Sequence, residues 1–150
     1  MLRKIILLTC ALALSNLQAY KIGDTIEPNI SKILELDKSK ITVVDFFASW
    51  CISCAKELPL INDLHKSSDS KKIEILGVDT DKDIKKGKAF QKKLALDFRV
   101  YNDSSQDVIG AFDPIGMPAC YIIKNGKIVD AIFGAVDDID KKLAKKIEGL

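Results

Sequence analysis

The chain of 150 residues is long enough for one domain to bury a core without cross-links, and 47% of its residues are hydrophobic and 29% charged. That balance is typical of a soluble globular protein and excludes a disordered chain. The formal charge of +2 comes from Arg3 and Lys4, because without them 23 − 2 = 21 basic residues face 21 acidic residues. The charge therefore gives no reason to expect a nucleic acid as partner.

Residues 1–19 have the order of a secretory signal peptide. Arg3 and Lys4 form a short basic region, an apolar run follows over 5–14, and a small residue ends the segment. We therefore expect residues 1–19 to be cleaved and residues 20–150 to form one domain in the periplasm. A retained membrane anchor is the less favoured alternative, because the apolar run is short for a bilayer span.

After a polar lead-in over 21–39, the sequence alternates strand and helix signals. Runs of β-branched and other apolar residues predict strands, and apolar residues at helical spacing predict helices. The predicted strands are 41–47, 73–78, 98–101, 119–123 and 128–133, the last two joined in a hairpin by Asn125-Gly126, and the predicted helices are 51–66, 83–96, 105–112 and 138–150. This order predicts an α/β fold with a central mixed β-sheet and helices on both faces.

Two of these helices carry further expectations. The helix over 83–96 is rich in lysine, which indicates a solvated surface, and its Ile84, Phe90 and Leu94 are expected to face inward. Pro59 lies inside the helix over 51–66 and is expected to bend it, because proline removes a backbone hydrogen bond.

Cys51 and Cys54 stand where the strand over 41–47 gives way to a helix. Two cysteines at this spacing form either a redox pair or half of a zinc site, and zinc would need two more ligands from a sequence that offers only His65 and the single Cys120. We therefore expect a redox disulfide, no metal and no cofactor. Free N–H groups and the helix dipole lower the pKa of a thiol at the position of Cys51, and its thiolate attacks disulfides. Cys54 is expected to lie deeper and to resolve the mixed disulfide.

The run VVDFFASWCISC over 43–54 resembles the active-site segment of thioredoxins. With its continuation AKELP it makes the pattern W-C-x-x-C-x-x-E-x-P, which is similar to the exported TlpA/ResA/CcmG branch of the thioredoxin-like superfamily. The residues GMP over 116–118 resemble the cis-proline loop of this fold, and FGA over 133–135 resembles its late glycine. The resemblance runs from about residue 23 to the end. It implies that residues 20–150 form a thioredoxin-like domain with the thioredoxin fold, and that the chain is a thiol–disulfide oxidoreductase.

Two acids accompany the cysteine pair. Asp45 interrupts an otherwise apolar strand, and we expect it to be an acid of raised pKa that exchanges protons with Cys54, with a structural hydrogen bond as the alternative. Glu57 lies one helical turn beyond Cys54. The resemblance implies that it is an active-site acid, with a solvated helix glutamate as the alternative.

Trp50, Met117 and Pro118 are the expected substrate-binding residues. The resemblance implies a cis bond before Pro118, which exposes the Met117 backbone to an extended substrate, whereas an ordinary trans turn proline is the alternative. Trp50 is expected to pack beside the pair as a platform, with a core role as the competing view. Cys120 departs from the family pattern and is expected to be an inert buried thiol, with a third redox-active sulfur near Cys54 as the alternative.

The sequence thus predicts a periplasmic thiol–disulfide oxidoreductase. Ile52 and Ser53 place no positive charge between the cysteines, which favours a reductant of client disulfides over a strong oxidant. The resemblance implies protein substrates with disulfides or thiols, apocytochrome c in cytochrome c maturation among them, and a membrane thiol as electron donor. The alternatives are an oxidase or isomerase of exported proteins, a copper-binding chaperone and, on the same fold, a peroxidase.

Overall fold

The computed structural model describes residues 19–150. Nearly all of the predicted signal peptide lies outside the described residues, so its cleavage stays a prediction. The elements follow one another as α1 (Pro28–Ile33), β1 (Ile41–Phe47), α2 (Ile52–Ser67), β2 (Ile73–Asp79), α3 (Ile84–Lys93), β3 (Arg99–Asn102), α4 (Asp107–Phe112), β4 (Ala119–Lys124), β5 (Lys127–Phe133) and α5 (Ile139–Glu148). Among residues 19–150, no helix has both the length and the apolar character needed to cross a bilayer.

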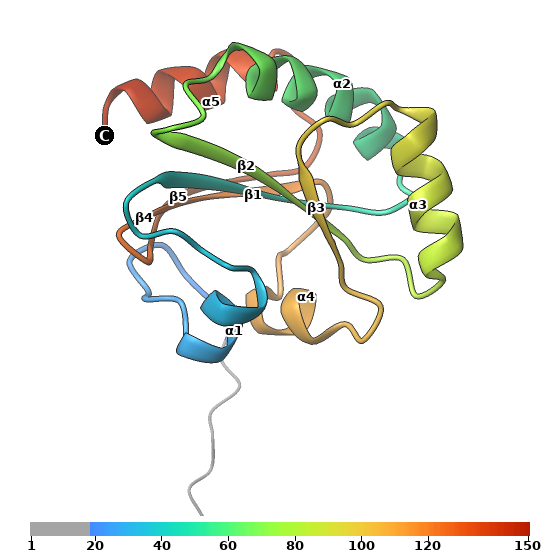
Figure 1. Cartoon of the computed structure of the whole chain (residues 1–150), viewed down its shortest axis with the longest axis horizontal. Coiled ribbons are helices and arrows are strands. Elements are labelled where there is room, and N and C mark those ends of the chain that lie inside the picture. The colour runs from blue at the N-terminus through green and yellow to red at the C-terminus, as the bar shows by residue number, and fades with distance from the viewer. Residues whose placement is uncertain (1–18) are drawn as a thin grey trace, which may run out of the picture.

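The five strands form one mixed sheet in the order β3-β2-β1-β4-β5 (Figure 1). β1, β2 and β3 run parallel, β4 pairs antiparallel with the other side of β1, and β5 pairs antiparallel with β4. The hairpin between β4 and β5 turns at Asn125 and Gly126, whose φ angles of 54° and 74° are both positive, as a tight two-residue hairpin loop requires. The mixed sheet and the hairpin predicted from the sequence are both confirmed.

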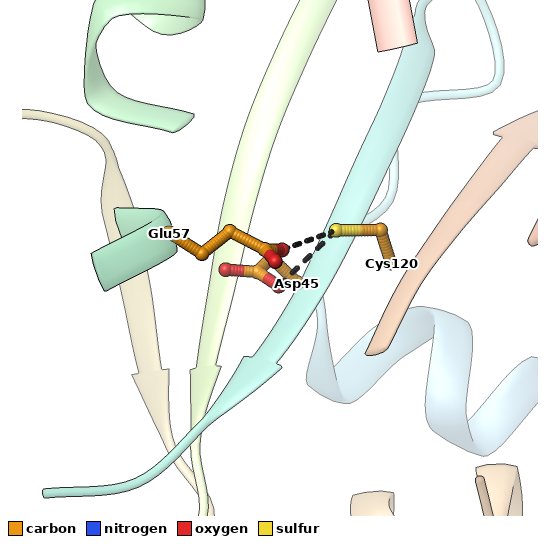
Figure 2. A group of neighbouring side chains, drawn as sticks. All are labelled: Asp45, Glu57 and Cys120. Carbon is orange, nitrogen blue, oxygen red and sulfur yellow. Dashed lines mark hydrogen bonds between the residues drawn. The ribbon is translucent and has the colours of Figure 1, made fainter. Parts of the chain in front are cut away.

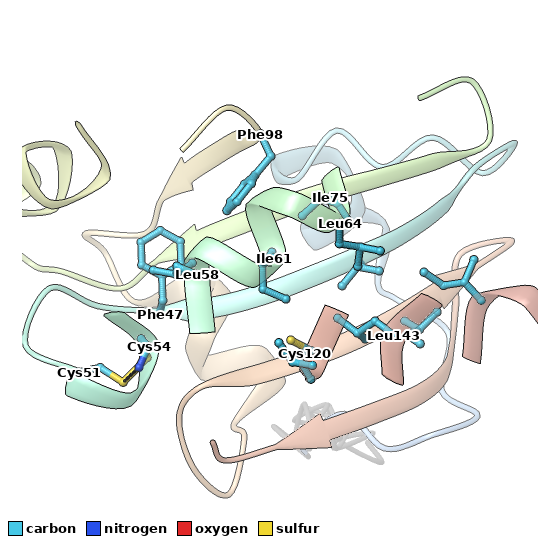
Figure 3. Packing of buried hydrophobic residues seen from close by; sticks show 14 residues of the cluster. Phe47, Cys51, Cys54, Leu58, Ile61, Leu64, Ile75, Phe98, Cys120 and Leu143 are labelled. Carbon is cyan, nitrogen blue, oxygen red and sulfur yellow. Dashed lines mark hydrogen bonds between the residues drawn. A yellow bond between two sulfur atoms is a disulfide. The ribbon is translucent and has the colours of Figure 1, made fainter. Parts of the chain in front are cut away.

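Helices cover both faces of the sheet, as predicted (Figure 1). Alternate residues of the central strands point to opposite faces, so Val43 and Phe47 of β1 join one core cluster and Val44 and Phe46 join the other. The first cluster, drawn in Figure 3, packs α2 and α5 on the sheet, and the second packs α1 and α4 on the opposite face. The first face also carries the cysteine pair, at the end of β1.

Two details differ from the sequence-based expectations. Ile84 is 41% exposed, so its inward placement is wrong, whereas Phe90 and Leu94 are partly buried against the core. α1 was not predicted, although its Pro28 stands at the start of the helix, a position that suits proline. α2 contains Pro59 and runs to Ser67, as predicted to within one residue, and the bend at Pro59 stays a prediction.

Candidate active site

β1 leads directly into the cysteine pair. Cys51 caps the N-terminus of α2, where its Sγ accepts a hydrogen bond of 3.2 Å from the backbone N–H of Cys54. The two residues form a disulfide. Cys54 is completely buried, and Cys51 retains 7% exposure. The expected order of depth is therefore confirmed, with Cys51 the sulfur nearer to solvent.

The loop between β1 and the pair is tied to the neighbouring strand through Ser49. Its N–H and its hydroxyl donate to the two carboxylate oxygens of Asp81, over 2.7 and 2.8 Å. The N–H of Asp81 in turn donates to Asp79 over 2.9 Å, and the N–H of Thr80 donates to the carbonyl of Phe47 over 2.9 Å. The residues after β2 thus hold the loop that presents the cysteines.

Asp79 and Asp81 are site residues that the sequence analysis missed. Both are buried, and burial raises the pKa of Asp79 to about 6, an effect that the charge of Asp81 reinforces and the bonds from Asp81 N–H and Gln91 oppose. The signal was present in the sequence. An Asp-Thr-Asp run closes a strand that is parallel to β1, and the carboxyl ends of parallel strands share one edge of the sheet.

A second group of polar side chains lies inside the core, between β1, α2 and β4 (Figure 2). Cys120 stands opposite Asp45 in the antiparallel pairing, and its Sγ lies 3.2 Å from Asp45 Oδ1 and 3.6 Å from Glu57 Oε1. Asp45 and Cys120 are each 1% exposed and Glu57 is 4% exposed. The solvated alternative for Glu57 is therefore wrong, and the expected burial of Cys120 is confirmed.

Burial raises the pKa of all three groups in this cluster. It raises the pKa of Asp45 well above the usual value, with the charge of Glu57 adding to the rise and the thiol opposing it. It raises the pKa of Glu57 to about 7, against the opposing effects of the Cys120 thiol and the Val136 backbone. Burial and then the two carboxylates raise the pKa of the Cys120 thiol well above its usual range. Cys120 therefore stays protonated at neutral pH.

The sulfur of Cys120 and one carboxyl oxygen each of Asp45 and Glu57, all possible metal ligands, lie within 4.8 Å of one another. The thiol contacts both carboxyls, so these three side chains form a hydrogen-bonded cluster. The absence of a metal and of a cofactor stays a prediction from the sequence. His65, the histidine considered as a zinc ligand, packs edge-on against Phe98 with ring centroids 6.1 Å apart. Its ring thus packs against the edge of the hydrophobic core in the last turn of α2.

The expected substrate-binding residues surround the same edge of the sheet. Ala119 pairs with Phe46 near the end of β1, which brings the preceding Met117 and Pro118 to the level of the cysteine loop. The Met117–Pro118 peptide bond is cis, so the trans alternative is wrong. Trp50 is 68% exposed, which excludes its core role.

Exposed apolar side chains continue this surface. Ile52 is 78% exposed and Ile115 is 89% exposed. A predominantly apolar groove of about 460 Å³ lies beside the cis-proline loop, between Tyr20, Ile115 and Phe133. An apolar partner therefore has contact area on this side of the molecule.

A mixed sheet with helices on both faces, a Cys-x-x-Cys pair at the helix that follows the central strand, and a cis-proline at the same edge define a thioredoxin-like protein. The chain belongs to the AhpC/TSA family, whose model matches residues 21–132, and it is similar to thiol-disulfide oxidoreductases of the ResA type.

Comparisons with individual proteins agree with this family. The chain is 34% identical over 98 residues to the thiol-disulfide oxidoreductase ResA of Bacillus thuringiensis (strain Al Hakam), which covers 65% of this chain and 57% of ResA. The chain thus spans less than two thirds of the length of such relatives.

Solved structures share the fold. A Chlorobium tepidum protein with the provisional name thiol:disulfide interchange protein DsbE gives a TM-score of 0.75 at 20% identity, over 87% of this chain and 98% of that one. The thioredoxin domain of a thiol-disulfide oxidoreductase from Bacteroides vulgatus gives 0.68 at 22% identity, over 86% and 99%.

Proposed function

We propose that this protein is a thiol–disulfide oxidoreductase that reduces disulfides in client proteins. The observation that carries the proposal is the Cys51–Cys54 disulfide at the N-terminus of α2. A thiolate at this position is stabilised by the free N–H groups of the first helical turn, one of which, that of Cys54, already bonds to Cys51 Sγ. The relatives named thiol-disulfide oxidoreductases support the same chemistry.

The reaction proceeds by two thiol–disulfide exchanges. In the reduced protein the Cys51 thiolate attacks one sulfur of the client disulfide, a mixed disulfide forms, and the second client sulfur leaves as a thiolate. Cys54 then loses its proton and attacks Cys51 Sγ, which releases the first client sulfur and closes the Cys51–Cys54 disulfide. Two electrons pass to the client. Asp45 is the proposed acceptor of the Cys54 proton, since its raised pKa suits a base in the core.

Reduction is the proposed direction because, among the described residues, little besides the helix terminus stabilises the Cys51 thiolate. Ile52 and Ser53 are uncharged, and a strong oxidant needs a strongly stabilised reduced form. A membrane thiol donor is proposed to return electrons to the pair.

The client is proposed to be an extended polypeptide with apolar side chains near its cysteine. Trp50, Ile52 and Ile115 offer exposed apolar area, and the Met117 backbone offers hydrogen-bonding groups to an added strand. The resemblance to the TlpA/ResA/CcmG branch favours apocytochrome c as client. The signal peptide predicted over 1–19 supports a periplasmic location.

Reduction of insulin by the purified protein tests the proposal. The wild type is expected to be active, Cys51→Ser inactive, and Cys54→Ser is expected to accumulate a mixed disulfide through Cys51, visible by mass spectrometry. Ser67→Ala, at the far end of α2, is the matched control. Tight stoichiometric Cu(I) binding without insulin reduction would contradict the proposal and favour a copper chaperone.

A further inference from the structure

The Asp45–Cys120–Glu57 cluster holds more contacts than one thiol proton can serve. Cys120 Sγ contacts a carboxyl oxygen of Asp45 at 3.2 Å and one of Glu57 at 3.6 Å, both visible as dashed lines in Figure 2. A thiol has a single proton and can donate to one carboxylate at a time. Both contacts become hydrogen bonds only when one carboxyl is protonated and donates to the sulfur. The geometry therefore suits a cluster that holds one proton on the thiol and one on either carboxyl.

The strands that flank the cluster add no titratable side chain to it. The residue opposite Asp45 on β2 is Gly77, and the residue opposite Cys120 on β5 is Ile132, so the flanking strands place no titratable group against the cluster. Asp45 Oδ2 and Glu57 Oε2 have no hydrogen-bond partner among residues 19–150. The hydrogen bond with Cys120 is thus the contact that links Asp45 to the rest of the cluster.

Glu57 connects this cluster to the surface. It lines a pocket of about 300 Å³ between α2 and the segment that leads into α5, together with Lys56, Asp137 and Asp138. Asp45 and Cys120 do not line it. Glu57 is therefore the member of the cluster that borders this pocket.

We propose that Cys120 is a positioning residue that joins Asp45 and Glu57 into one unit, through which Asp45 exchanges protons with the surface pocket. In the exchange the O–H bond of Asp45 breaks as a new S–H bond forms, and the former S–H bond breaks as the O–H bond of Glu57 forms. No electrons are transferred, and Glu57 releases the proton to solvent in the pocket. The thiol contributes one step that a methyl group at this position cannot. The catalytic relevance of this exchange rests on the proposed function, in which Asp45 receives the Cys54 proton.

The test of the coupling between Asp45 and Glu57 through Cys120 is a pH titration of the two carboxyls by carbon-13 NMR. It uses the oxidised full chain with Cys10 replaced by serine. The thiol lowers the pKa of both carboxyls, so Cys120→Ala is expected to move the Glu57 midpoint upward from about 7 by about one pH unit, the worth of one hydrogen bond to a carboxylate. Cys120→Ser keeps a donor and should restore much of the shift. Ile122→Val removes a similar volume from the same face of β4 and should leave the midpoint in place.

Equal Glu57 midpoints in Cys120→Ala and Ile122→Val would overturn the inference. Should Cys120→Ala fail to fold, the Raman S–H band of Cys120 in the Cys10→Ser protein decides, because Cys120 is then the one free thiol of the chain. The band is expected to shift as Glu57 titrates, and a band that stays constant with pH would overturn the inference.

The two proposals fail separately. If the chain reduces no disulfide, the proposed function is wrong while the carboxyl titrations still decide the role of Cys120. If it does reduce disulfides, the pH profile of the Cys54 step, measured in a single turnover, is expected to move upward in Cys120→Ala by the same amount as the Glu57 midpoint and to return in Cys120→Ser. A profile that does not move would contradict the inference alone.

Discussion

Replacing Glu57 with glutamine should remove part of the pH dependence of stability. The carboxyl is 4% exposed and one of its oxygens has no partner. Burial, opposed by the Cys120 thiol and the Val136 backbone, raises its pKa from 4.5 to about 7. A carboxyl with a raised folded-state pKa binds its proton more tightly in the folded protein than in the unfolded chain. Its contribution to stability is therefore complete below pH 4.5 and is lost as the pH rises through about 7.

The magnitude follows from the same shift. The difference between about 7 and 4.5, at roughly 1.36 kcal/mol for each pH unit, gives about 3 kcal/mol as an upper value for the free energy of unfolding that ionisation of Glu57 removes. Glutamine has nearly the same volume and keeps one acceptor oxygen but never ionises. Glu57→Gln and the wild type should thus have similar stability near pH ~5, and the variant should be more stable by about 2–3 kcal/mol near pH ~8.

Urea unfolding followed by far-UV circular dichroism at several pH values measures this difference. Glu148→Gln, on the exposed end of α5, controls for the loss of a glutamate charge and should follow the wild type. The reasoning is refuted if Glu57→Gln loses as much stability between the two pH values as the wild type does. Such a result would mean that Glu57 ionises in the folded protein as readily as in the unfolded chain.

Three further substitutions test the loop and the client surface. Gly87→Ala places a Cβ 2.5 Å from Asp79 Oδ2 and should lower the free energy of unfolding by about 1–3 kcal/mol; a urea midpoint like that of the wild type contradicts this. Asp81→Asn weakens both bonds from Ser49 and should cost about 1–3 kcal/mol, measured in the same way, whereas unchanged stability would show that these bonds do not hold the loop. Trp50→Ala should change the free energy of unfolding by less than about 0.5 kcal/mol, because the side chain is 68% exposed. The same substitution should lower kcat/KM for insulin about tenfold. A kcat/KM equal to that of the wild type would show that Trp50 does not contact the client.

The strands were predictable because their residues decide them locally. Ile41–Phe47 and Ala119–Lys124 are nearly continuous apolar runs, as strands buried on both faces require. Helix ends were less predictable. α3 ends at Lys93 and α5 at Glu148, earlier than the apolar spacing suggests, because spacing describes a face and contains little information about where the backbone stops. Ile84 shows the same limit, since its spacing fits a buried face that the fold leaves exposed.

The site was predictable as a list of residues and less so as an arrangement. Cys51, Cys54 and Asp45 follow from one contiguous run, so their neighbourhood is dictated by the strand and helix that contain them. The contact of Cys120 with Asp45 depends on the register of two strands 75 positions apart in the chain, which the sequence does not state. The burial of Glu57 depends on the segment near Val136 that closes over α2. Long-range packing supplies both contacts.

The cost of the buried cluster argues that its role is chemical. Asp45 and Glu57 each have one buried carboxyl oxygen that lacks a partner among the described residues. Each unsatisfied buried polar atom costs about 1–3 kcal/mol of folding free energy. Apolar side chains of the same volume at these core positions would therefore make the folded protein more stable. The structural alternative for Asp45, a hydrogen bond, is met by Cys120 at 3.2 Å, but that bond does not compensate the free oxygen. The same face of the sheet carries the Cys51–Cys54 pair. A proton-transfer role for the cluster, serving the nearby cysteine pair, would account for carboxyls that lower the stability of the folded protein.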